Sequence, residues 1–253
     1  MGWRDLVYGA YERRVLKSLP RESLPRHVAV MLDGNRRWAR ARGAGTAHGH
    51  QAGADKIHEL LQWCEEAGVE YVTLWLLSTD NLQREQDELA PLLKIIENAV
   101  ADLAASRRWR LRLAGAAELL PEATAQSLRE SVESTADVQG MTVNIAVAYG
   151  GRREIADAVR DLLLERAGAG ESIEQIASGL TAADIAGHLY TKGQPDPDLV
   201  IRTSGEQRLG GFLLWQSATS EFYFCEAYWP DFRHVDFLRA LRAYAGRHRR
   251  HGT

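Results

Sequence analysis

The spacing of apolar residues along this chain changes from segment to segment between a pattern typical of strands and a pattern typical of helices. Short apolar or alternating runs predict strands at residues 27–32, 71–77, 109–115, 141–149, 198–202 and 212–216. A spacing of three to four residues predicts helices over about 51–67, 88–106, 121–136, 151–166 and 234–248. Strands that alternate with helices need crossover connections, which predict a parallel sheet covered on both faces. We expect one domain over residues 1–253, with a helical extension at 1–24.

Composition narrows the class of protein. Hydrophobic residues make up 45% of the chain, which argues against intrinsic disorder, and the formal charge of −3 argues against a polybasic nucleic-acid module. No nucleic-acid partner is therefore expected. Of the 31 basic residues, 27 are arginines. Because arginine suits bidentate capture of phosphate or carboxylate, the positions of these residues matter more than the net charge.

Several features bear on the compartment. The two cysteines, Cys64 and Cys225, cannot build a disulfide framework or a cysteine-rich metal site. No apolar run approaches the roughly 18 residues of a membrane-spanning helix, and the first residues carry both charge signs, unlike a signal peptide. These features predict a soluble cytoplasmic protein. The amphipathic N-terminal stretch could touch a membrane surface, although a packed surface helix is the favoured interpretation.

Polar residues gather directly after four of the predicted strands. The four clusters are Asp33-Gly34-Asn35-Arg36-Arg37-Trp38, Ser78-Thr79-Asp80-Asn81 with Arg84, Gly150-Gly151-Arg152-Arg153-Glu154, and Arg202 to Arg208. In open parallel sheets, ligands bind at the edge formed by the carboxyl ends of the strands. The four clusters together therefore predict one binding site at that edge.

The first cluster has the composition of a metal–diphosphate site. Gly34 allows close approach of the backbone to a ligand, and a helix that begins near Asn35 would favour an anion. Arg36 and Arg37 add charged donors. Asp33 would repel a phosphate unless a divalent cation bridges them, and Mg²⁺ uses one or two carboxylates together with phosphate oxygens. The alternative is a strand-to-helix turn, capped by Asp33, with both arginines in solvent.

The other clusters carry weaker signals. Arg202 and Arg208 could clamp a second anion, or they could lie on a surface loop and pair with Glu206. The glycines at 150–151 lack the G-x-G-x-x-G spacing, which favours a simple helix start. His50 could donate to a phosphate, but the histidine spacing predicts no zinc site.

Long motifs also follow one another in a fixed order between residues 25 and 250. They are MLDGNRRWA, GHQAGADKI, STDN with Arg84, NIAVAYGGRREI, PDLVIRTSGEQRLGGFLLWQSATSEFYF and WPDF. Together they resemble the cis-prenyltransferases, the undecaprenyl diphosphate synthase family. The resemblance implies an α/β fold with a central, mostly parallel six-stranded sheet, flanking helices and a hydrophobic tunnel, usually as a homodimer. It also implies a Mg²⁺-dependent enzyme that joins isopentenyl diphosphate to an allylic diphosphate.

Residue roles follow from the same resemblance. Asp33 would hold Mg²⁺ and assist departure of the allylic diphosphate, and Asn81 would act near the proton that leaves isopentenyl diphosphate. Glu221 would be a second metal ligand that reaches across from a partner subunit. The remaining residues implied to bind substrate are Gly34, Asn35, Arg36, Arg37, Trp38, His50, Ser78, Thr79, Asp80, Arg84, Arg202, Arg208, Leu209 and Gly210.

Departures from the family pattern point to the chain length of the product. Leu82 replaces a tryptophan and Asp80 a glutamate of the long-chain members, while Thr46 and Gly210 replace an arginine and a serine common near the phosphates. The motifs are most similar to the bacterial short-chain members, which make (2Z,6E)-farnesyl diphosphate from geranyl diphosphate. We expect bulky side chains near Leu82 and the helix at 88–106 to close the tunnel. The product could bring the enzyme into peripheral contact with a membrane.

Three alternatives stay open on the sequence. The first is a medium- or long-chain synthase that serves a cell-wall lipid carrier. The second is a non-catalytic partner subunit, although such partners lose the acidic and phosphate-binding residues that this chain keeps. The third is a generic nucleotide-binding module, which rests only on fold analogy.

Overall fold

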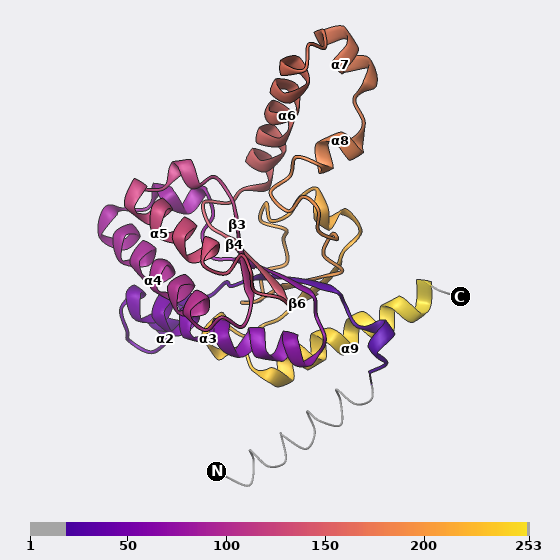
Figure 1. Cartoon of the computed structure of the whole chain (residues 1–253). Coiled ribbons are helices and arrows are strands. Elements are labelled where there is room, and N and C mark those ends of the chain that lie inside the picture. Colours follow the sequence, from indigo (N-terminus) through magenta and orange to yellow (C-terminus); the bar gives the residue numbers. More distant parts are fainter. Residues whose placement is uncertain (1–18, 252–253) are drawn as a thin grey trace.

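Six parallel strands form the centre of the molecule (Figure 1). The structure is a computed structural model that describes residues 19–251, so most of the expected N-terminal extension lies outside the described residues. The strands are β1 (His27–Met31), β2 (Tyr71–Trp75), β3 (Arg110–Ala114), β4 (Thr142–Ala146), β5 (Leu199–Arg202) and β6 (Glu221–Phe224). Their order is β3-β4-β2-β1-β5-β6, and every neighbouring pair is parallel. This arrangement confirms the predicted six-stranded sheet.

The helices lie on both sides of this sheet. They are α2 (Asn35–Ala41), α3 (Thr46–Glu66), α4 (Gln86–Ala105), α5 (Glu122–Glu133), α6 (Gly151–Gly168), α7 (Ile173–Gly179), α8 (Ala182–Ala186) and α9 (His234–His251). The five long helices predicted from the spacing are confirmed, with shifted ends. The short helices α7 and α8 were not predicted, although each begins with a capping box, at Ser172 and Thr181.

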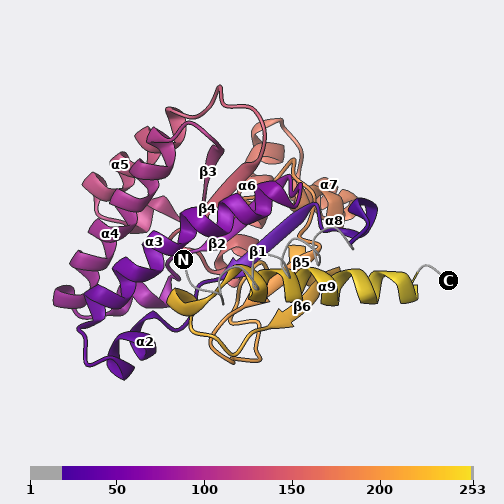
Figure 2. The ribbon, with the colours of Figure 1, turned by 90° about the horizontal axis from the view of Figure 1, so that it is seen from below.

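The two faces of the sheet differ in what covers them. Side chains alternate between the faces along each strand, so Val28 and Val30 join a large core with residues of α3, α4, α5 and α9. Ala29 and Met31 join a smaller core with Tyr149, Phe212 and Leu213. We call these the helix-covered face and the loop-covered face. Seen from below, α3 and α9 lie in front of the strands (Figure 2).

The run at 212–216 is not a strand, which corrects the sequence prediction. Leu213 is buried at a positive φ of 45°, and its N–H donates to the Tyr149 hydroxyl at 3.1 Å instead of to a neighbouring strand. Phe212 stacks on Trp75, with ring centroids 5.0 Å apart. The run is apolar because it fills the loop-covered face, a role that the sequence pattern does not separate from a buried strand.

The segment α6–α8 projects from the rest of the chain (Figure 1). Helix α6 contacts both α7 and α8. His188 ties this projection together, because one ring nitrogen lies 2.9 Å from Glu165 Oε2 on α6 and the other lies 2.8 Å from the carbonyl oxygen of Asp184. Between residues 19 and 251, we find no helix with the length and apolar character needed to cross a membrane.

Candidate active site

A cavity of about 1090 Å³ opens at the carboxyl edge of the sheet. Met31 of β1 pairs in register with Arg202 of β5 and with Trp75 of β2, so the three strands end level and their following loops meet. The predicted residues that line the cavity are Asp33, Gly34, Asn35, Arg36, Arg37, His50, Ser78, Asp80, Asn81, Arg84, Arg202, Arg208 and Gly210. Three of the four predicted clusters therefore meet. The fourth, Gly150–Glu154, begins α6 behind the cavity wall.

Asp33 and Arg202 form an ion pair at the centre of this edge. The Nε and Nη2 atoms of Arg202 lie 2.9 Å and 2.8 Å from the same oxygen, Oδ2 of Asp33. Arg202 is buried, with 6% of its side chain exposed, whereas 38% of the Asp33 side chain is exposed. The buried guanidinium fixes one carboxylate oxygen, and Oδ1 has no protein partner among the described residues. This arrangement leaves Oδ1 available to a cation.

Gly34 is required by the turn that follows Asp33. Its φ is +108°, and a Cβ atom there would lie 2.8 Å from Cδ1 of Tyr228. Both the left-handed backbone and the contact exclude other residues. The turn places Arg36 and Arg37 on α2, at the cavity wall.

Glu206 lies between two arginines of the cavity. Its carboxylate is 3.3 Å from Nη2 of Arg37 and also forms an ion pair with Arg208. The pairing of Arg208 with Glu206 was one of the alternatives for this loop, but the pair faces the cavity. Arg37 is held further by Ser204, whose Oγ accepts a hydrogen bond of 2.7 Å, and its guanidinium lies 5.6 Å from the ring centre of Tyr228.

Glu88 on α4 lies beside two arginines and a histidine of the cavity. Its Oε1 atom is 3.0 Å from Arg84, 3.5 Å from Arg36 and 4.0 Å from Nε2 of His50. Burial, together with the positive charge of Arg84, lowers the pKa of His50 to about 4. The neutral ring has a buried Nε2 atom without a hydrogen-bond partner in the described part of the chain. Three carboxylates thus hold five cavity arginines, while Arg40 lines the cavity without such a pair among residues 19–251.

Asn81 is fixed to the wall through Ser78. The backbone N–H of Asn81 donates to Ser78 Oγ at 3.1 Å, and the Ser78 N–H donates to Asn81 Oδ1 at 3.5 Å. These reciprocal bonds hold the short 3-10 helix at Asp80–Gln83 over the cavity.

A small apolar pocket of about 40 Å³ adjoins the cavity. It lies between the carboxyl edge and the helix-covered face, and shares Leu32, Asn35, His50, Leu76 and Leu92 with the cavity. Helices α3 and α4 supply its deeper walls, with Ile57, Ile95, Ile96 and Ala99 among the lining residues. A ligand with an anionic head in the cavity could extend a short apolar tail into this pocket.

The model of a protein family described as putative undecaprenyl diphosphate synthase matches residues 31–252. The chain belongs to this prenyltransferase family. It is 61% identical to a (2Z,6E)-farnesyl diphosphate synthase of Thermobifida fusca, over 97% of each chain. It is 58% identical to isoprenyl transferase 1 of Streptomyces avermitilis, over 99% of this chain and 97% of that one.

A solved structure supports the same assignment. The crystal structure of lavandulyl diphosphate synthase from Lavandula x intermedia, in complex with dimethylallyl diphosphate, superimposes with a TM-score of 0.81. The two chains are 33% identical, and the match covers 88% of this chain and 96% of that one. The family resemblance and the predicted fold class are therefore confirmed, and the protein is a prenyltransferase.

The donor set of this prenyltransferase fits a metal that is shared with substrate. No group of three or more His, Cys, Asp or Glu side chains suited to a metal occurs in the described residues. Mg²⁺ does not need such a group, because it binds through one or two carboxylates and completes its shell with water and phosphate oxygens. The free Oδ1 of Asp33, beside several arginines, meets this requirement.

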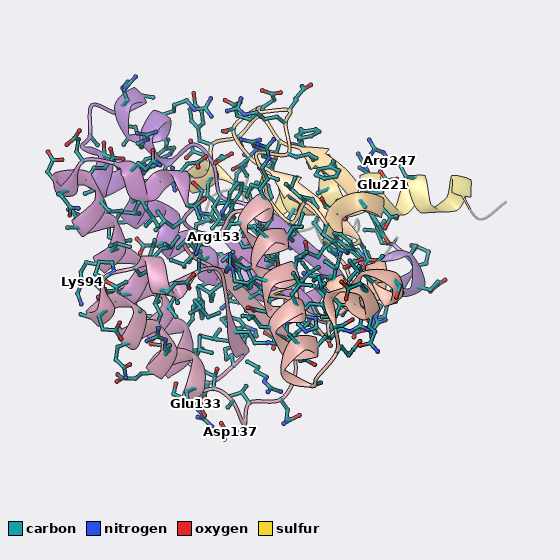
Figure 3. The ribbon with its side chains drawn as sticks, turned by 90° about the horizontal axis from the view of Figure 1, so that it is seen from above. Lys94, Glu133, Asp137, Arg153, Glu221 and Arg247 are labelled. Carbon is teal, nitrogen blue, oxygen red and sulfur yellow. The ribbon has the colours of Figure 1, made fainter. Side chains whose placement is uncertain are left out.

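Four predicted site residues lie elsewhere. Trp38 stacks on His48 outside the cavity lining, Thr79 faces Gly150, and Leu209 is 42% exposed. Glu221 begins β6, at the opposite edge of the sheet from Asp33, and pairs with Arg247 of α9 at 2.5 Å (Figure 3). One chain therefore does not bring Glu221 to its own cavity.

Some residues that line the cavity were not predicted from the sequence. Glu88, Arg40, Trp75 and the backbone of Gly43–Thr46 also line it. Only Glu88 left a signal in the sequence, since it follows Arg84 by four residues at the start of a helix.

The buried position of Glu154, a residue of the fourth predicted cluster, was not predicted from the sequence. Glu154 is fully buried and accepts hydrogen bonds from the Tyr149 hydroxyl, the Tyr190 N–H and the Gln216 amide. Burial raises the pKa of Glu154 and, more strongly, that of Tyr149. Because the Tyr149 hydroxyl also accepts the N–H of Leu213, the cluster anchors the segment 208–216 that carries Arg208.

Proposed function

We propose that this prenyltransferase condenses isopentenyl diphosphate with geranyl diphosphate to give (2Z,6E)-farnesyl diphosphate, with Mg²⁺ as cofactor. The observation that carries the proposal is an arginine-lined cavity of about 1090 Å³ that adjoins an apolar pocket walled by α3 and α4. Relatives from Thermobifida fusca and Mycobacterium tuberculosis, 61% and 54% identical, are named (2Z,6E)-farnesyl diphosphate synthases. Their names support the same substrate class.

Two anion subsites would hold the two substrates. Arg36, Arg37 and His50 surround the place for the allylic diphosphate, next to the apolar pocket that receives its tail. Arg202 and Arg208 also line the cavity and would hold isopentenyl diphosphate. Binding both diphosphates brings the terminal alkene carbon of isopentenyl diphosphate beside C1 of the allylic substrate, which lowers the entropic cost of the reaction.

The reaction then needs charge stabilisation and loss of one proton. The bond from C1 to the diphosphate oxygen breaks, a new bond joins C1 to C4 of isopentenyl diphosphate, and a proton leaves C2. Mg²⁺ at Asp33 would offset charge on the departing diphosphate. The arginines stabilise the same oxygens, and Asn81, held by Ser78, would orient the group that loses the proton.

The aliphatic side chains that line the apolar pocket support a short product. Helix α4 supplies Leu92, Ile95, Ile96 and Ala99 to the pocket, as expected for the helix at 88–106. Leu82 packs against the core of the helix-covered face instead and does not line the pocket. Each further isoprene unit would need apolar space for five more carbons, and the side chains of α4 would have to move to provide it.

We further propose that the enzyme is a cytoplasmic homodimer in which the partner's copy of Glu221 supplies the second carboxylate. The proposal is supported by β6, which is the outermost strand on one side of the sheet. Its side chains are half-buried, and Glu221 is its first residue. A second copy could cover this edge, where backbone groups lack a neighbouring strand within the described region.

An assay of product length tests the proposal. Radiolabelled isopentenyl diphosphate is incubated with the enzyme, Mg²⁺ and geranyl diphosphate, and the dephosphorylated product is separated by chromatography. We expect a C15 product and little elongation beyond it. A main product of C50 or longer would identify a long-chain synthase, and no turnover with any allylic primer would indicate a non-catalytic subunit.

A further inference from the structure

Ser204 has a backbone conformation that disfavours its own side chain. Its φ is +75°, in the left-handed region, and the next residue, Gly205, has φ +73°. Serine pays a steric cost there that glycine avoids. Two backbone bonds hold this turn beside the segment after β6, from Ser204 N–H to Ala227 O at 2.7 Å and from Gly205 N–H to Cys225 O at 2.9 Å. The conformation is therefore imposed by the fold.

The side chain of Ser204 has one substantial polar contact. Only 6% of the residue is exposed, and its Oγ accepts the hydrogen bond of 2.7 Å from Nη2 of Arg37. Its Cβ also lies 3.1 Å from the position that a Cβ of Gly34 would occupy. Ser204 thus touches two residues of the Asp33–Trp38 cluster, although 167 positions separate it from Arg37 in the sequence.

The chemistry of this contact differs from the other contacts that hold the cavity arginines. Asp33, Glu88 and Glu206 hold arginines with negative charge, and a diphosphate must compete with that charge. A hydroxyl fixes a guanidinium without neutralising it. Arg37 is also 3.3 Å from Glu206, but its shorter contact, at 2.7 Å, is the neutral one with Ser204. With 46% of its side chain exposed, Arg37 keeps donors for an anion in the cavity.

We infer that Ser204 is a positioning residue of the allylic-diphosphate subsite, where its hydroxyl aims the guanidinium of Arg37 at the substrate. The strained backbone at residue 204 is retained because the hydroxyl must be there. The inference rests on the proposed function only in assigning Arg37 to the allylic diphosphate.

Two substitutions separate positioning from stability. Ser204→Ala and Ser204→Gly both remove the hydroxyl, but only glycine relieves the left-handed backbone. We expect both variants to raise KM for the allylic diphosphate about tenfold, the size expected for a lost hydrogen bond to a charged group, with kcat and the KM for isopentenyl diphosphate changed less than about threefold. Thermal stability should diverge, since Ser204→Ala should melt below wild type and Ser204→Gly above Ser204→Ala.

The control is Ser23→Ala, which removes another buried hydroxyl with its own hydrogen bond, to Pro20 O at 2.8 Å, far from the cavity. It should leave both KM values unchanged. An allylic KM that rises in Ser204→Ala but returns to the wild-type value in Ser204→Gly would show that serine acts only through stability. Unchanged KM values in both variants would also overturn the inference.

Binding of inorganic pyrophosphate, measured by calorimetry, gives a readout that needs no turnover. We expect both Ser204 variants to weaken it by about the same tenfold factor. If wild type elongates a primer other than geranyl diphosphate, the KM comparison is made with that primer. Failure of the chain-length proposal is then distinguishable from failure of the role of Ser204.

Discussion

The two faces of the sheet are stabilised by different kinds of contact. The helix-covered face packs aliphatic side chains of β1, β2 and β4 against α3, α4 and α5, and it borders the apolar pocket. The loop-covered face carries a smaller core and a row of buried polar side chains. On it, His27 lies 2.8 Å from the Thr73 hydroxyl, and Asn144 donates to the same hydroxyl at 2.9 Å.

The two faces meet two different requirements of the site, which are space for hydrocarbon and fixed positions for charged side chains. Apolar contacts have little directional preference, so the helix-covered face can provide space for hydrocarbon and tolerate small changes of shape. Hydrogen bonds are directional, so the Glu154–Tyr149 pair on the loop-covered face fixes the segment that carries Arg208. The cavity lies at the edge where both faces end. Substitutions at the carboxyl edge and on each of the two faces should therefore differ in how they change kcat, KM and the free energy of unfolding.

The largest effect is expected at the shared edge. Asp33→Asn keeps an acceptor for Arg202 but removes the charge that attracts a cation. We expect kcat to fall about a thousandfold, equivalent to ~4 kcal/mol, while the free energy of unfolding changes by about 1 kcal/mol or less. Steady-state kinetics and urea unfolding measure the two quantities.

Asp137→Asn is the matched control, because that carboxylate is exposed and paired with Arg107 away from the cavity. It should behave as wild type in both measurements. Near-normal turnover of Asp33→Asn would remove Asp33 from the metal site.

An intermediate effect is expected on the loop-covered face. Tyr149→Phe deletes the hydroxyl between Glu154 and Leu213, leaving buried polar groups without a partner, so the free energy of unfolding should fall by about 1–3 kcal/mol. Because the freed segment carries Arg208, the KM for isopentenyl diphosphate should rise more than that for the allylic substrate.

Ile145→Val, on the helix-covered face, serves as the comparison. It should cost about 0.5–1.5 kcal/mol of stability and leave both KM values unchanged. If the two variants shift the KM values alike, the proposed division between the faces is wrong.

The smallest effect concerns His50, at the boundary between cavity and pocket. Its folded-state pKa is about 4, below the ordinary value of 6.5, so the unfolded chain binds its proton more readily. Stability from this group is complete above pH 6.5 and is lost as the pH falls toward 4, by about 1–3 kcal/mol. Urea unfolding between pH 4 and 7 should show a flatter profile for His50→Gln than for wild type.

The exposed neighbour His48 provides the control for that experiment, because His48→Gln should keep the slope of wild type. Equal slopes for His50→Gln and wild type would contradict the burial argument.

Sequence patterns predicted the parts of the molecule that depend on local order. The runs at 27–31 and 71–75 are strands because nearly all of their side chains are buried, which leaves a continuous apolar signal. The rule that parallel strands end at a common edge then placed Asp33 and Arg202 together. The same apolar signal failed at 212–216, and β6 was missed because it is a short, half-buried edge strand.

Other parts of the site depend on information that no local pattern contains. The contact of Ser204 with Arg37 requires a left-handed turn imposed by the segment after β6. The sharing of Glu206 by Arg37 and Arg208 depends on how two distant loops meet. The proposed role of Glu221 depends on a second chain, which a pattern within one sequence does not describe.

The carboxylates that pair with the cavity arginines also affect the release of diphosphate after each reaction. A diphosphate that binds these arginines as proposed would compete with their pairs to Asp33, Glu88 and Glu206, and the pairs could re-form when it departs. These acids therefore weaken the hold on the substrate and on the released diphosphate alike. A cavity lined by arginines alone would bind pyrophosphate more tightly and would be more strongly inhibited by its own by-product.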